Sequence, residues 1–62
     1  MIRFFLITFQ WPTGTGFRTN TMWGNTDQVS DGDAFRDILE DARTRGIPND
    51  ATVITFHLEP AR

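Results

Sequence analysis

Few side chains in this sequence could do chemistry. His57 is the one histidine, and Glu59 follows two residues later, so both would lie on one face of a β-strand. Such a pair can transfer protons. However, the chain has no cysteine, and Ser30 lies where a helix is expected to begin, so no nucleophile stands beside the pair. We interpret His57 as a solvent-facing strand histidine and predict that the protein is not an enzyme.

Acidic residues gather between positions 27 and 41, which raises the question of a calcium site. They are Asp27, Asp31, Asp33, Asp37, Glu40 and Asp41. When Gly32 is aligned with the glycine of an EF-hand loop, Val29 falls at a ligand position and Ile38 at the position of the bidentate glutamate. Neither side chain can bind a cation. Acids at a helix start and on a solvated helix face explain the cluster better, so we predict no metal site.

A Thr-Gly-Thr-Gly segment, residues 13–16, contains two glycines but has the wrong surroundings for a phosphate loop. Phosphate loops open a helix and carry further glycines or a lysine. This segment joins two predicted strands and has neither feature. We therefore predict no nucleotide and no other cofactor.

A helix is predicted between about residues 31 and 45. Apolar residues recur there at the spacing i, i+3, i+4 and i+7, which gives one buried stripe: Phe35, Ile38, Leu39 and Ala42. Ser30, Asp31 or Asp33 can accept hydrogen bonds from the first free amides. Gly46 is a typical left-handed helix end, Ile47 can fold back on the last turn, and Pro48 prevents continuation.

Three strands are predicted around this helix, at residues 2–11, 17–24 and 52–58. The first is apolar on both of its faces, which is typical of a central strand. The second has a polar middle, as an edge strand often does. We therefore predict an α+β fold of order β-β-α-β over a single domain, residues 1–62. Its antiparallel sheet has spatial order 2-1-3, and the helix packs on one face.

The pairing of the first two strands decides which side chains share a face. A turn centred near Gly14 pairs Trp11 with Phe17, Phe5 with Trp23, and Leu6 with Met22. We expect the larger set to lie under the helix: Phe5, Ile7, Phe9, Trp11, Phe17 and Trp23, with Ile54, Phe56 and Leu58 from the third strand. This leaves the other set bare: Ile2, Phe4, Leu6 and Met22, with Val53 beside them. The opposite assignment would leave an aromatic face bare.

A bare apolar patch of more than a few hundred Å² usually marks an interface. The alternative is that Arg3, Arg18 and the chain ends cover the patch, so that nothing binds there. A chain of 62 residues without disulfides has a thin core, and oligomerisation is one way to stabilise it.

The charge of the chain narrows the class of partner. The formal net charge is −2, and all six basic residues are arginines. Nucleic acids and membrane surfaces bind proteins with a positive field, so this balance disfavours both. A second hypothesis remains open, in which exposed aromatic residues stack on bases while Arg3 and Arg18 hold phosphates.

The apolar start of the chain is too short to span a bilayer and lacks a signal-peptide cleavage site, which predicts a cytoplasmic protein.

Two segments of the sequence resemble a group of short, uncharacterised proteins from GC-rich bacteria. They are residues 4–14, FFLITFQWPTG, and residues 56–60, FHLEP. The group is associated with phage-like and plasmid-like gene neighbourhoods, so the resemblance implies an accessory role on a mobile element. It implies no activity and no functional residue.

These observations together predict a non-enzymatic interaction module. It would dimerise, or dock an unidentified protein, through the uncovered sheet face. Phe4, Leu6 and Met22 would be buried against the partner, and the polar edge residues Arg18 and Gln10 would fix the register. The second hypothesis is a nucleic-acid-binding accessory protein.

Overall fold

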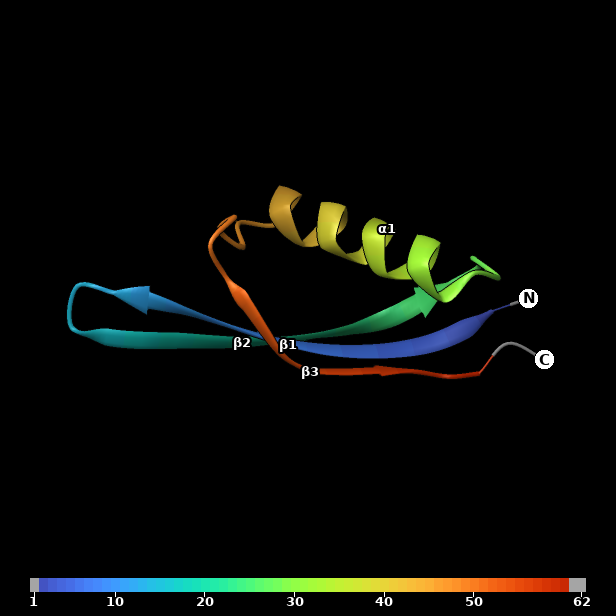
Figure 1. The fold of residues 1–62 in the computed structure, drawn as a ribbon, viewed down its shortest axis with the longest axis horizontal. Coiled ribbons are helices and arrows are strands. Elements are labelled where there is room, and N and C mark those ends of the chain that lie inside the picture. The colour runs from blue at the N-terminus through green and yellow to red at the C-terminus, as the bar shows by residue number, and fades with distance from the viewer. Residues whose placement is uncertain (1, 61–62) are drawn as a thin grey trace.

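The computed structural model describes residues 2–60, which form one three-stranded sheet and one helix (Figure 1). In chain order the elements are β1 (Arg3–Thr13), β2 (Gly16–Thr26), α1 (Asp31–Thr44) and β3 (Thr52–Leu58). Both strand pairs are antiparallel and the order across the sheet is β2-β1-β3, with α1 on one face (Figure 1). The predicted α+β fold, its strand order and the central position of β1 are confirmed.

The ends of α1 follow from local sequence. The Ser30 side chain caps the helix by accepting a hydrogen bond from the Asp33 amide at 3.4 Å. At the other end Gly46 has φ of +98°, which a side chain would disfavour. The amides of Gly46 and Ile47 donate to the carbonyls of Arg43 and Ala42, which is a Schellman motif. Ile47 is buried as a result, as predicted.

The register of the β1–β2 hairpin differs by one residue from the prediction. Thr13 pairs with Gly16 across a two-residue turn, so Ile7 lies opposite Met22 and Leu6 lies opposite Trp23. Paired residues share a face of the sheet, and a slip of one residue exchanges the two faces of a strand. Met22 therefore lies on the helix side and Trp23 on the other. The predicted positions of both were wrong.

The core lies between α1 and the odd-numbered side chains of β1. Its buried members are Phe5, Ile7, Phe9, Ala34, Ile38, Ala42 and Ile47. Phe35 packs edge-on against Phe56, with ring centroids 5.0 Å apart. The expected covering of Phe5, Ile7 and Phe9 is confirmed, and Trp11 is partly buried beside them. Phe17, which was expected under the helix, is 72% exposed.

The sheet has an irregularity in β3 that corrects a further expectation. Thr8 pairs with Thr55 but Phe9 pairs with Val53, so Ile54 is the extra residue of a bulge. Val53 consequently packs against the core and Ile54 is half-exposed. The sequence alternation predicted the reverse for these two residues, while Phe56 and Leu58 face the helix as expected.

The far end of the hairpin projects beyond the rest of the molecule. β3 pairs with β1 only from Phe5 to Gln10, and α1 does not reach further (Figure 1). Residues 11–18 therefore form a two-stranded extension, here called the arm. It accounts for the elongated shape, with extents of 43, 18 and 16 Å.

Candidate interaction surface

Within residues 2–60, no helix or strand covers the sheet face opposite α1 (Figure 1). We call it the uncovered face. The register places the following side chains on it: Phe4, Leu6, Thr8, Gln10 and Pro12 from β1; Phe17, Thr19, Thr21, Trp23 and Asn25 from β2; and Thr52, Thr55 and His57 from β3. These side chains are apolar or polar, and the carboxylate of Glu59 lies at the end of the face, beside Phe4.

Leu6 lies at the centre of the most apolar part of the uncovered face. Its neighbours across the sheet are Trp23 on β2 and His57 on β3. Leu6 is half-buried by them, whereas Trp23 is 69% exposed and Phe4, one position along the face, is 37% exposed. These side chains form one contiguous apolar patch whose largest member projects into solvent.

Further along the face the side chains are threonines. The hydroxyls of Thr8 and Thr21, which are cross-strand partners, lie 3.0 Å apart in a hydrogen bond. Such pairs stabilise neighbouring strands. They leave the middle of the uncovered face polar but without charge.

No arginine of the described residues 2–60 lies on the uncovered face. Arg18 pairs with Trp11 and therefore shares the helix side of the sheet, and the remaining exposed arginines are on α1 or its cap. Arg3 lies opposite Thr26 on the helix side and is only 1% exposed. The guanidinium groups of the sheet are thus directed away from the aromatic side chains of this face.

The buried Arg3 side chain has a structural role that the sequence analysis missed. Its guanidinium donates to the carbonyls of Gln28 (3.1 Å), Val29 (3.0 Å) and Glu59 (2.8 Å), and to the carboxylate of Asp31 (2.5 Å). It joins the loop before α1 to the end of β3. The spacing Arg3, Phe5, Ile7 was the available signal, because alternate residues of a strand share a face.

The structure divides the predicted interaction residues into two groups. Phe4, Leu6 and Gln10 lie on the uncovered face, whereas Met22 and Arg18 lie on the helix side. The placement of Met22 was wrong because of the register. Gln10 is also not an edge residue, since β1 pairs with Thr19 on one side and Thr52 on the other at that position.

Two exposed apolar residues lie on this surface where Met22 was expected. They are Trp23 and Phe17. Trp23 and Phe17 were assigned to the core because the predicted register placed them beside Phe5 and Trp11. A hairpin closed by the two-residue turn Gly14–Thr15 would have predicted their exposure.

The acid–base candidates lie at one end of the same sheet. His57 is exposed next to Leu6. The Glu59 carboxylate accepts a hydrogen bond of 2.9 Å from the Phe4 amide, and the Glu59 amide donates to the Phe4 carbonyl, also at 2.9 Å. Glu59 therefore extends the pairing of β3 with β1.

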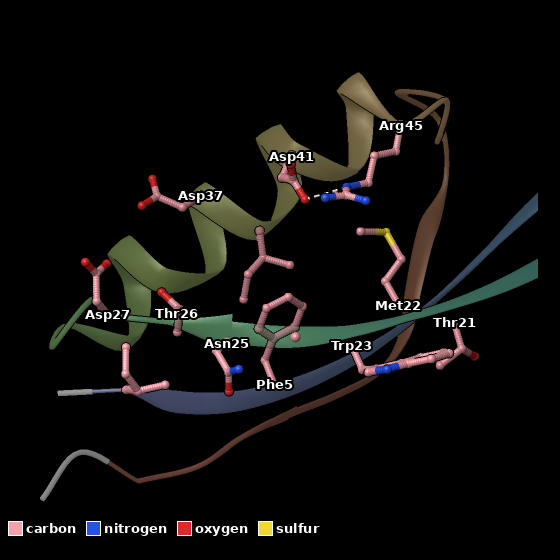
Figure 2. Close-up of a pocket in the computed structure, with 13 residues that line it drawn as sticks. Phe5, Thr21, Met22, Trp23, Asn25, Thr26, Asp27, Asp37, Asp41 and Arg45 are labelled. Carbon is pink, nitrogen blue, oxygen red and sulfur yellow. Dashed lines mark hydrogen bonds and ion pairs between the residues drawn. The ribbon is translucent and has the colours of Figure 1, made fainter.

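A groove of about 700 Å³ runs between α1 and β2 on the helix side (Figure 2). Phe5, Met22 and Ile38 give it an apolar floor. Its rim carries Asp27, Asp37, Asp41 and Arg45, and Arg45 is paired with Asp41 at 2.8 Å. The groove follows the outer edge strand of the sheet and has an acidic rim.

Within residues 2–60 no cluster of three or more histidine, aspartate or glutamate side chains is arranged to hold a metal ion. No helix in this part of the chain is long and apolar enough to cross a membrane.

Comparisons with protein-family models, curated proteins and solved structures found no match to the chain.

Proposed function

We propose that this protein is a non-enzymatic interaction module that binds a protein through its uncovered face. The observation that supports the proposal is the character of that face. It has a contiguous apolar patch around Leu6, and none of the arginines within residues 2–60 lies on it. Apolar patches of this kind are typical of protein interfaces.

The binding energy would come from the apolar centre of the face. Phe4, Leu6 and Trp23 are already partly covered, so burying their remaining surface is worth less than the roughly 5–9 kcal/mol of three fully exposed side chains, before the costs of association. Trp23 is the expected anchor, because tryptophan dominates many interfaces and this one projects from its sheet. The neighbouring threonines would supply hydrogen bonds at the rim.

The nucleic-acid hypothesis loses its main support in the structure. A base-stacking sheet needs cations next to its aromatic side chains. Here Arg3 is buried on the opposite side and Arg18 shares the face of Trp11, so neither lies beside Trp23. A protein partner suits an apolar face without arginine better.

The proposal is tested by two matched baits in affinity capture, each compared with the unmodified chain. Leu6→Asp places a charge at the centre of the uncovered face. Val29→Asp places the same charge at an exposed apolar residue of the loop before α1. We expect protein partners other than the chain itself to bind the unmodified and Val29→Asp baits but not the Leu6→Asp bait.

Circular dichroism on each bait verifies that the helix and sheet are retained. Trp23→Ser is a second variant on the same face, and its side chain is exposed enough for the fold to tolerate the change. Equal capture by all four baits would contradict the proposal.

A further inference from the structure

We infer that two copies of this chain pair through their β2 edges, with Asn20 at the two-fold axis, to form one continuous six-stranded sheet. The partner is thus a second copy. The pairing would join the uncovered faces of the two copies into one larger surface. The use of that surface for binding rests on the proposed function. The pairing itself can fail independently of that function.

The first argument is that β2 is an unprotected edge. It runs for eleven residues in unbroken register with β1, without a proline and with Arg18 as its one charged side chain. Natural edge strands usually carry prolines, bulges or charges that prevent pairing with other chains. β3, the other edge, is shorter, carries a bulge at Ile54 and is followed by Pro60. The molecule therefore protects one edge and leaves the other able to pair.

The second argument is that β2 is complementary to itself. Phe17 and Trp23 each lie three residues from Asn20 and share the uncovered face. In an antiparallel pair centred on Asn20, each Phe17 lies directly opposite Trp23 of the other copy. Aromatic cross-strand pairs are favourable. Because the contact is two-fold symmetric, the Phe17–Trp23 pair occurs twice in it. Centring the pair on Thr21 or Met22 instead would set Phe17 against Asn25 or Asp27.

The third argument is steric. The pairing places residues 16–18 of each arm beside residues 22–24 of the other copy. The arm carries no helix, so it can approach β2 where α1 overhangs it (Figure 1). A two-stranded ribbon is marginally stable by itself, and the pairing would set each arm beside the three strands of the second copy.

Charge complementarity supports the same arrangement. A two-fold axis perpendicular to the sheet keeps both helices on one side. Arg18 then lies next to Met22 of the other copy, at the groove (Figure 2). The rim of that groove carries three carboxylates and the one guanidinium of Arg45. In this arrangement the exposed Arg18 of one copy lies close to the acidic rim of the other copy's groove.

The absence of native cysteine makes a direct test possible. In the proposed pair the two Asn20 Cα atoms would lie about 4.5–5.5 Å apart, within the range of a disulfide. Asn20→Cys should therefore form covalent dimers in a glutathione redox buffer. The control is Asn25→Cys, also exposed on β2, whose two copies would lie on the order of 30 Å apart. We expect the Asn20→Cys variant to cross-link roughly tenfold faster than this control, or more.

Sedimentation equilibrium gives an independent measurement without oxidation. The unmodified chain should show a monomer–dimer equilibrium, and Phe17→Lys should weaken it by roughly tenfold or more. Val29→Lys, at an equally exposed apolar residue, should not. Phe17 lies on the arm outside the core, so the variant retains the fold.

Three results would each overturn the pairing. They are equal cross-linking of the two cysteine variants, a dimer unaffected by Phe17→Lys, and a monomer at every concentration. None of them would contradict the proposed function, which is decided by the capture experiment with Leu6→Asp. Conversely, β2 pairing combined with equal capture by all baits would support the dimer and remove the docking role of the face.

Discussion

Arg3 and Asp31 are joined by a hydrogen-bonded ion pair of 2.5 Å in which the arginine is almost fully buried and the aspartate side chain is 79% exposed. The same guanidinium donates to three backbone carbonyls, so it fixes the start of β1 against the loop before α1 and the end of β3. The importance of Arg3 therefore lies mainly in the carbonyls that it satisfies. The pair itself is open to water on the Asp31 side.

This asymmetry predicts different costs for the two partners. Arg3→Ala should lower the free energy of unfolding by about 2–4 kcal/mol, because several carbonyls lose their donor inside the fold. Arg3→Lys should recover only part of the loss, since a single ammonium cannot reproduce the guanidinium fork. Asp31→Asn should cost less than about 1 kcal/mol, as exposed ion pairs do. Urea unfolding monitored by circular dichroism measures all three, and an equal loss for Arg3→Ala and Asp31→Asn would contradict this account.

The helix end provides a second prediction. Gly46→Ala should destabilise the protein by about 1 kcal/mol, because φ of +98° is unfavourable for any residue with a Cβ. The added methyl group meets no atom within 4 Å, so the cost is one of backbone conformation alone. Gly14→Ala is the matched control, since its surroundings are equally open and its φ is not positive. Equal thermal unfolding midpoints for both variants would show that the Schellman geometry contributes nothing.

The Phe35–Phe56 contact links α1 to β3 and can be measured directly. A double-mutant cycle with Phe35→Leu and Phe56→Leu should give a coupling free energy of about 0.5–1.5 kcal/mol, the range for edge-to-face aromatic pairs. A cycle of Phe56→Leu with Val29→Ala serves as the control, because Val29 is exposed outside the core cluster. Strict additivity of Phe35 and Phe56 would be incompatible with the observed packing.

The two tryptophans lie in different environments, which fluorescence can distinguish. Trp11→Phe leaves Trp23 as the one emitter, and Trp23→Phe leaves the half-buried Trp11. We expect Trp23 to emit further to the red and to be quenched more strongly by acrylamide in dilute protein. The Trp23 signal should also shift to the blue as protein concentration rises, if the β2 edges pair. Identical quenching of the two variants would disagree with the register of the hairpin.

Local sequence determined the helix and the order of the strands. Ser30 and Gly46 each act on backbone groups within a few residues of themselves, so the limits of α1 could be predicted without tertiary contacts. The two-sided apolarity of residues 2–11 likewise required a central strand, and β1 has that position. These features depend on backbone geometry and periodicity, which short segments already contain.

Tertiary structure decided which residues form the surface. The hairpin register differs by one residue from the predicted one, and each register sets some apolar side chains opposite one another, so strand composition could not separate them. The packing under α1 distinguishes the two registers. Gly24 lies opposite Phe5, and even a Cβ there would come within 3.3 Å of the Phe5 ring. A tryptophan at that place would need volume that the ring occupies. Trp23 is therefore on the uncovered face because the space beneath the helix is filled, a property of the assembled core and not of any one segment.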